Sequence, residues 1–258
     1  MSVKRHGDNE NRLVMGKRAV RELLRAAPER IASVWYAGKA ELPEGEMGEL
    51  IARHGLRVKR LSPAELTAEL GSDSHQSIAA MLTDRRLVSL ADLLQSGDGR
   101  EEMLVVVLDG LEDPHNFGAV MRAAECFGAA AVIWSRNRGT GITPVVAKAS
   151  AGASEILDLV PVSNLADALR KLKDKGFWTV AAAVGEDCVP LPAFERPRKL
   201  ALVLGAEGRG ISQLLLREAD FRVKIPMLGR VEALNVSQAA SVMLYALQLA
   251  KEDAAFSV

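Results

Sequence analysis

The segment LDGLEDPHNFGAVMRAAE, at residues 108–125, places an amide, a guanidinium and a carboxylate directly after an apolar run. Asn116 opens a helical stretch, and Arg122 and Glu125 share one face of it because they are three residues apart. An amide and a guanidinium near the end of a strand can orient a ligand and stabilise a developing negative charge. Taken alone, the same residues also fit a structural role, with Asn116 as a helix cap and Arg122 and Glu125 as a solvated pair.

A second apolar run ends in the glycine-rich segment GAEGRG, at residues 205–210, which surrounds Glu207. Glycine has no Cβ, so Gly205 and Gly210 permit a close backbone approach to a ligand. The spacing is GxxGxG, and both the dinucleotide fingerprint GxGxxG and the phosphate loop GxxxxGK(S/T) are absent. The segment therefore predicts either a ligand-binding loop outside those two classes or a plain turn between a strand and a helix.

A third segment, residues 225–237, contains a short loop with proline and glycine and then the start of a helix at Asn235 and Ser237. The first backbone N–H groups of a helix have no partner within it, so they are free to bind a ligand. A capped helix without a ligand is the alternative for this segment alone.

The elements that must position these segments alternate between apolar runs and helical stretches. Strands are expected at residues 104–108, 130–134, 178–184, 200–204 and 221–225. Helices are expected at residues 117–127, 144–154, 165–175, 212–219 and about 234–251. This alternation predicts an α/β fold with a parallel sheet covered on both faces. Ligands bind at the carboxyl ends of such strands, which is where the three segments lie.

The rest of the chain predicts a second, smaller domain. Residues 1–10 are polar, and we expect them to be disordered. Short helical and strand signals alternate over residues 11–85 and predict a small α/β domain. Residues 86–102 are polar and contain glycine, with a short helix-like piece at 90–94, and we interpret them as a linker. Residues 103–258 then form the domain that carries the three segments.

Composition narrows the functional classes. The 33 basic and 33 acidic residues give no net charge, but residues 1–30 carry eight basic residues against four acidic ones. The N-terminal residues lack the apolar stretch of a secretory signal, and no apolar run has the length of a membrane span. Cys126 and Cys188 form no CxxC pair and the four histidines are scattered, so no metal site is expected. These features favour a cytoplasmic location.

In order and spacing, the three segments together resemble the signature motifs of the SpoU-type (TrmH-like) RNA ribose 2′-O-methyltransferases of the SPOUT superfamily. The resemblance covers essentially all of residues 103–252. Two features of the N-terminal part, Met15-Gly16-Lys17 before a helix and His75-Gln76 before a strand, resemble the L30e-like RNA substrate-binding domain that precedes this catalytic domain.

The resemblance implies a fold and a reaction. It implies a SPOUT-type parallel sheet with a deep C-terminal trefoil knot, whereas periodicity alone predicts a doubly wound sheet without one. It further implies S-adenosyl-L-methionine as cofactor, RNA as substrate and a homodimer built on the final helix, with the apolar stripe of Val242, Met243 and Ala246. The layout resembles in particular members that methylate a guanosine of 23S rRNA. A tRNA substrate stays open, because tRNA methyltransferases share these motifs.

The resemblance also assigns roles to residues. The implied catalytic residues are Asn116, Arg122, Glu207 and Asn235. The implied cofactor-binding residues are Gly205, Gly210, Ile225, Met227 and Leu234. In the family, Arg122 would activate the 2′-hydroxyl, but a guanidinium is protonated at neutral pH and is a poor base. We therefore favour a role in which Arg122 binds the phosphate and the hydroxyl. Asn116 and Asn235 would orient Arg122 and the ribose, and Glu207 would fix the guanidinium.

Two positions depart from the family pattern, and two other classes stay open. Ala233 stands where the family usually has serine, and Ser77 stands where it often has glycine. One alternative is an RNA-binding protein with a vestigial cofactor site, against which the four intact polar residues argue. The other is an enzyme with an ordinary nucleotide-binding fold, against which the missing fingerprints argue.

Overall fold

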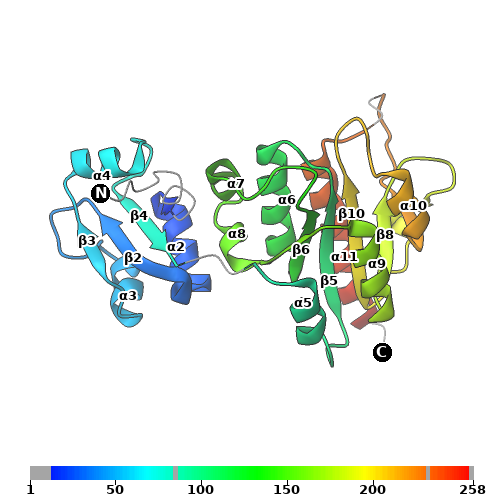
Figure 1. Ribbon diagram of the computed structural model, residues 1–258, viewed down its shortest axis with the longest axis horizontal. Coiled ribbons are helices and arrows are strands. Elements are labelled where there is room, and N and C mark those ends of the chain that lie inside the picture. Colours follow the sequence, from blue (N-terminus) through cyan, green and yellow to red (C-terminus); the bar gives the residue numbers. More distant parts are fainter. Residues whose placement is uncertain (1–12, 84–86, 231–232, 256–258) are drawn as a thin grey trace. The chain divides into compact units, whose positions relative to one another are not determined.

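Figure 1 shows the computed structural model of the chain, which describes residues 13–83, 87–230 and 233–255. The predicted disorder of residues 1–10 lies outside these described residues. Within them, no helix combines the length and apolar character needed to cross a bilayer. Contacts separate the chain into two compact units, each with its own sheet.

The first unit comprises the chain up to Arg86 together with a later segment, Ile142–Ile156, which the sequence analysis placed in the second domain. In its four-stranded sheet, of order β1-β4-β2-β3, β4 is antiparallel to β1 and β2, and β3 is parallel to β2. The strands are β1 (Leu13–Met15), β2 (Ile31–Tyr36), β3 (Val58–Arg60) and β4 (Ile78–Leu82). The helices are α2 (Lys17–Ala26), α3 (Glu46–Arg53), α4 (Pro63–Leu70), α7 (Pro144–Ala149), α8 (Ala153–Ile156) and the 3-10 helix η1 (Pro28–Arg30).

Both faces of this sheet are covered. Helices α2 and α3 contribute buried side chains such as Leu23 and Ile51 to one core, and α4 places the buried Leu66 in the other. At the start of α4, the hydroxyl of Ser62 accepts the backbone N–H of Glu65, and the Glu65 carboxylate accepts the backbone N–H of Ser62. This reciprocal capping box satisfies two donors at the helix start.

The α7–α8 segment is held in the first unit by a largely buried ion pair. Nη2 of Arg30 lies 3.2 Å from Oε2 of Glu155, whose side chain is 1% exposed. The sequence predicts one helix over residues 144–154, but the structure has two. Ala151 and Gly152 separate them with positive φ angles of 51° and 97°, which a continuous right-handed helix cannot contain.

The second unit contains a seven-stranded sheet of order β7-β6-β5-β10-β8-β11-β9, and every neighbouring pair is parallel. The predicted α/β class and parallel sheet are confirmed. The strands are β5 (Met103–Asp109), β6 (Ala131–Ser135), β7 (Asp158–Val162), β8 (Trp178–Ala182), β9 (Val189–Pro190), β10 (Lys199–Gly205) and β11 (Phe221–Lys224). The helices are α5 (Leu90–Ser96), α6 (Pro114–Cys126), α9 (Leu165–Asp174), α10 (Gln213–Glu218), α11 (Val236–Ala255) and the 3-10 helix η2 (Leu191–Ala193).

The central strand β5 is buried on both sides. Val105 and Val107 join a core that contains Leu93, Leu169 and Leu215 of helices α5, α9 and α10. The intervening residues of β5 are equally buried, and alternation places them on the opposite face, where α6 and α11 pack together. This two-sided burial explains why the strands appear as continuous apolar runs in the sequence.

Four elements of the second unit differ from the prediction: β7, α5, and the short β9 and η2, which were not expected. Strand β7 was not expected because Pro161 interrupts its apolar run, but β7 is an edge strand, where proline is tolerated. Helix α5 lies inside the predicted linker of residues 86–102, yet its Leu93 is 1% exposed in the core. The polar residues that follow α5 conceal this packing in the sequence.

Candidate active site

The site lies where the order of the strands reverses. From β5 the chain continues to β6 and β7 on one side, whereas β10 lies on the other side beside β8. Strands β5 and β10 end in register, with Asp109 opposite Gly205. The loops that follow two such strands diverge, and this is where open α/β sheets bind ligands. The first two predicted motif segments meet at this edge.

Residues 206–210 form a tight hairpin. The N–H of Gly210 donates to the carbonyl of Ala206 at 2.8 Å, and Gly208 and Gly210 adopt positive φ angles of 74° and 63°. The hairpin returns so closely that a Cβ on Gly205 would lie 2.2 Å from the carbonyl carbon of Gly210. The close approach at Gly205 is therefore to the chain's own backbone, a reason for glycine that the sequence does not reveal.

Asp109 fixes the far end of the glycine segment. It is 8% exposed, and its carboxylate accepts the backbone N–H of Ser212 at 2.7 Å. Because Ser212 directly precedes α10, this bond satisfies a donor at the helix start. The sequence analysis did not select Asp109, although a charged residue at the end of an apolar strand was an available signal.

The larger of two cavities at this edge has a volume of about 440 Å³, within the range of small-molecule sites. It lies at the ends of β8, β10 and β11 and the start of α11. Its walls include all five residues predicted to bind the cofactor: Gly205, Gly210, Ile225, Met227 and Leu234. Ala182, Ala183 and Val184 also line it. They were not among the predicted cofactor residues, although they form the end of the strand predicted at residues 178–184.

A smaller cavity of about 120 Å³ adjoins the larger one. It lies between the loop after β5, which contains Glu112, and the 206–210 hairpin, and Asn116 of α6 lines it. The two cavities share four wall residues: Ala206, Glu207, Arg209 and Val236. A ligand in one cavity would therefore lie next to a ligand in the other.

Three of the four predicted catalytic residues meet beside the smaller cavity. The side-chain amide of Asn235 donates to Oδ1 of Asn116 at 3.0 Å and to the carboxylate of Glu207. Oδ1 of Asn235 accepts the backbone N–H of Ser237 at 2.8 Å and its hydroxyl at 2.6 Å. Asn235 thus caps α11 and also joins the three motif segments.

Arg122 is not part of this cluster. It is exposed on α6, six residues after Asn116 and about 9 Å further along the helix axis, and it lines neither cavity. No hydrogen bond or ion pair joins it to a described residue, so neither the predicted pair with Glu125 nor the predicted contact with Glu207 is present there. Nor does Asn116 cap α6, because Asp113 occupies that position.

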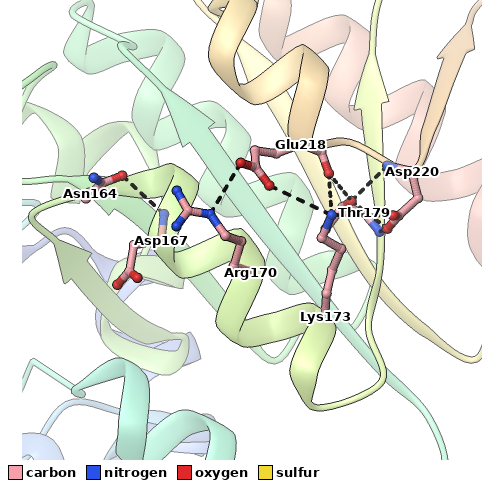
Figure 2. Close-up of polar contacts among 7 residues, drawn as sticks. All are labelled: Asn164, Asp167, Arg170, Lys173, Thr179, Glu218 and Asp220. Atoms are coloured by element: carbon pink, nitrogen blue, oxygen red, sulfur yellow. Dashed lines mark hydrogen bonds and ion pairs between the residues drawn. The ribbon is translucent and has the colours of Figure 1, made fainter.

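A polar network lies at the opposite end of the strands, where β8 and β11 begin (Figure 2). Lys173 of α9 donates to the backbone carbonyl of Glu218 at 2.8 Å and lies 3.6 Å from the carboxylate of Asp220. Asp220 in turn accepts the backbone N–H and hydroxyl of Thr179 at 2.8 and 2.7 Å. These contacts fix the starts of β8 and β11, whose other ends line the larger cavity, so the network supports the site without lining it.

Comparison with known families identifies the chain. Residues 103–245 match the family described as SpoU rRNA methylase, and residues 13–88 match RNA 2′-O ribose methyltransferase substrate binding. The chain belongs to the SpoU rRNA methylase family. It is thus an RNA methyltransferase, and the predictions of the family, of an enzyme and of S-adenosyl-L-methionine as the family's cofactor are confirmed.

Individual relatives cover nearly the whole chain. The 23S rRNA (guanosine-2′-O-)-methyltransferase RlmB of Pseudomonas putida is 36% identical over 236 residues, which are 90% of this chain and 94% of that protein. A putative TrmH family tRNA/rRNA methyltransferase of Staphylococcus haemolyticus is 33% identical over 92% of this chain and 94% of its own. The structure of the SpoU methyltransferase AviRb from Streptomyces viridochromogenes superposes with a TM-score of 0.74 at 23% identity, over 93% of this chain and 90% of that one. The AviRb likeness supports the fold.

The two departures from the family pattern lie in different environments. Ser77 has a φ of 65°, in the left-handed region that favours glycine, the residue often found there in the family. Its backbone N–H donates to Nδ1 of His75 at 3.0 Å, which helps hold the turn. Ala233 lines the larger cavity and is exposed, so the missing serine hydroxyl would have faced this cavity.

Proposed function

We propose that this chain transfers a methyl group from S-adenosyl-L-methionine to the ribose 2′-hydroxyl of a guanosine in 23S rRNA. The observation that carries the proposal is the pair of adjoining cavities, with Asn116, Glu207 and Asn235 joined beside their common wall. Methyl transfer needs a donor and an acceptor held side by side, and alignment is the main task of the enzyme.

The larger cavity suits the cofactor. Its volume of about 440 Å³ and its apolar walls at Ile225, Met227 and Leu234 fit a nucleoside with an aliphatic chain. The backbone of the hairpin offers polar groups beside Gly205 and Gly210. The AviRb structure was determined in complex with AdoMet, which supports the same assignment. When bound, the cofactor supplies a methyl group that its sulfonium makes electrophilic.

The smaller cavity then receives the acceptor ribose. Asn116 lines it and is oriented by the amide of Asn235, which is itself held by the α11 cap. Side chains locked in this way keep hydrogen-bonding groups in place before the substrate arrives, which lowers the cost of alignment. Glu207 anchors the same amide and lies on the wall shared with the cofactor cavity.

Arg122 approaches the acceptor from outside both cavities. Its exposed position on α6 leaves the guanidinium free to bind the RNA backbone and the hydroxyl together. It stabilises the oxyanion as the 2′-hydroxyl forms its bond to the methyl group and loses its proton to water, whereas a true base at this position would need a neutral guanidinium. Because no hydrogen bond or ion pair joins Arg122 to a described residue, RNA rather than Glu207 would fix its orientation.

The choice of 23S rRNA rests on the RlmB relative, and the main alternative is tRNA. RlmB of P. putida is by its name a 23S rRNA guanosine methyltransferase, whereas the S. haemolyticus relative is named for tRNA or rRNA. A catalytically inactive RNA-binding protein is a further alternative, against which the intact Asn116, Glu207 and Asn235 cluster argues.

Several finer features complete the proposal. We assign residues 11–85 to an L30e-like RNA-binding domain and 103–258 to a SPOUT domain with a deep trefoil knot, in a cytoplasmic homodimer. The proposed linker between them, residues 86–102, contains α5, which packs into the core of the second unit. For the dimer, the residues of the apolar stripe on α11 differ in burial. Met243 is 1% exposed and lines the larger cavity, whereas Val242 is 41% exposed. The exposed side of α11, including Tyr245, is therefore the surface available for the two-fold contact.

Methyl transfer in vitro tests the proposal. The purified protein is incubated with methyl-labelled S-adenosyl-L-methionine and unmodified 23S rRNA or tRNA, and the labelled nucleoside is identified after digestion. Label in 2′-O-methylguanosine from 23S rRNA is the expected result. Label in tRNA alone supports the alternative substrate, and RNA binding without any label supports the inactive alternative.

A further inference from the structure

One exposed ion pair joins the two loops that border the smaller cavity. Nη2 of Arg209 lies 2.5 Å from Oε1 of Glu112, and the two side chains are 75% and 69% exposed. Both residues line the smaller cavity, and Arg209 also lines the larger one. Exposed ion pairs add little net stability, so this pair can be exchanged for another at small cost.

The described walls of the smaller cavity carry more negative than positive charge. Glu112, Asp113 and Glu207 contribute carboxylates, and Arg209 contributes the one cation among the wall residues that the structure describes. Such walls oppose the entry of a polyanion such as RNA. Arg209 is the wall residue that can offset this repulsion, provided that Glu112 releases it.

This inference rests on the proposed function. In RNA the 3′-phosphate is attached to the ribose carbon next to the one that carries the 2′-hydroxyl. A hydroxyl placed at the wall shared by the two cavities therefore brings a phosphodiester close to the loops around that wall. A guanidinium binds phosphate through paired, charge-assisted hydrogen bonds, which makes Arg209 a suitable partner.

We propose that Arg209 binds the phosphodiester next to the acceptor ribose and that Glu112 competes with this phosphate for it. RNA that enters the smaller cavity exchanges the Glu112 carboxylate for its own phosphate. RNA that cannot bring a phosphate to this position leaves the ion pair intact and meets only the carboxylates. Glu112 thus acts as a specificity-determining residue, because it disfavours RNA that does not fit.

The chain contains a matched control. Arg198 and Glu101 form a similar ion pair of 3.0 Å with side chains 73% and 81% exposed. They precede β10 and β5, the same two strands that Arg209 and Glu112 follow, so this pair lies at the opposite edge of the sheet. If the Arg209–Glu112 ion pair only holds its two loops together, substitutions in the two pairs should change RNA affinity to the same extent.

RNA affinity of the full chain tests the proposal. The dissociation constant is measured against salt concentration for the wild type, Arg209→Ala, Glu112→Gln and the double variant, with Arg198→Ala and Glu101→Gln as controls. The probe is unmodified 23S rRNA or tRNA, whichever the wild type binds more tightly. Methyl transfer by the wild type is measured separately, so that its absence counts against the proposed function, whereas this inference is decided by RNA affinity.

The two single variants should act in opposite directions. Arg209→Ala should weaken RNA binding about tenfold and reduce the slope of log affinity against log salt by about 0.7. Glu112→Gln should tighten binding about two- to fivefold, and this gain should vanish in the double variant. Affinity for S-adenosyl-L-methionine should stay within about twofold in Glu112→Gln and in the two control variants, none of which lies on the wall of the larger cavity. Single variants that shift RNA affinity in the same direction, or no more than the controls do, overturn the proposal, as does a loss of affinity in Arg209→Ala that is confined to the cofactor.

Discussion

Gly205→Ala should disable the site by moving the hairpin, although it adds only one methyl group. The new Cβ would lie 2.2, 2.3 and 2.4 Å from three backbone atoms of Gly210 and Ile211. Ordinary carbon contacts are about 3.5 Å, so the 206–210 hairpin must shift by about 1 Å. The obstacle is backbone, which cannot rotate away as a flexible side chain could.

Two measurements follow from this shift. Overpacking should lower the free energy of unfolding by about 1–3 kcal/mol, as measured by urea denaturation. Displacing Glu207 and the wall of the larger cavity by about 1 Å should reduce single-turnover methyl transfer about 10²-fold. Gly141→Ala is the matched control, because its Cβ would meet no atom within 4 Å. Wild-type stability and turnover in Gly205→Ala would refute the reasoning.

Four further predictions concern single features. Arg122→Ala should leave cofactor binding nearly intact while reducing turnover about 10²–10⁴-fold at saturating RNA. Arg122→Lys should reduce turnover almost as much if the planar guanidinium binds phosphate and hydroxyl together. Near-wild-type turnover of Arg122→Ala would remove Arg122 from the proposed catalytic residues. Asp109→Ala should lower the free energy of unfolding by about 1–3 kcal/mol because the N–H of Ser212 loses its acceptor, and an unchanged urea midpoint would exclude this role. Ser77→Gly should raise stability by about 1 kcal/mol by relieving the left-handed φ, and a lower melting temperature would argue that the serine side chain compensates. Light scattering at micromolar concentration should give the mass of a dimer, and an active monomer would contradict that prediction.

The sequence predicted the second unit well wherever burial alone determines the pattern. Strands buried on both faces appear as unbroken apolar runs, so β5 and β10 were found nearly to their ends. Strand β7 was not predicted, because Pro161 fits a strand only at the edge of a sheet. Which strand lies at the edge depends on the topology of the sheet. The division of the 144–154 helix depends on φ angles at two residues, one of them an alanine that gives no warning.

The motifs in the sequence indicated which residues gather at the candidate site, but not which contacts these residues make with one another. The residues predicted to bind the cofactor, such as Gly205 and Leu234, line one cavity because each follows a strand, and the strands end on the same side of the sheet. In the structure the Glu207 carboxylate accepts the Asn235 amide, and no hydrogen bond or ion pair to Arg122 is present among the described residues. Arg209 was not among the predicted site residues. Its partner Glu112 is distant in the sequence, and only the register of β5 with β10 brings the two residues together.

The most direct test of the central claim is a map of 2′-O-methylated nucleotides in the rRNA and tRNA of a strain that lacks this protein. The account predicts the loss of one ribose-methylated guanosine from 23S rRNA and its return when the wild-type chain is supplied. A map in which every 2′-O-methyl mark of 23S rRNA persists would contradict the account.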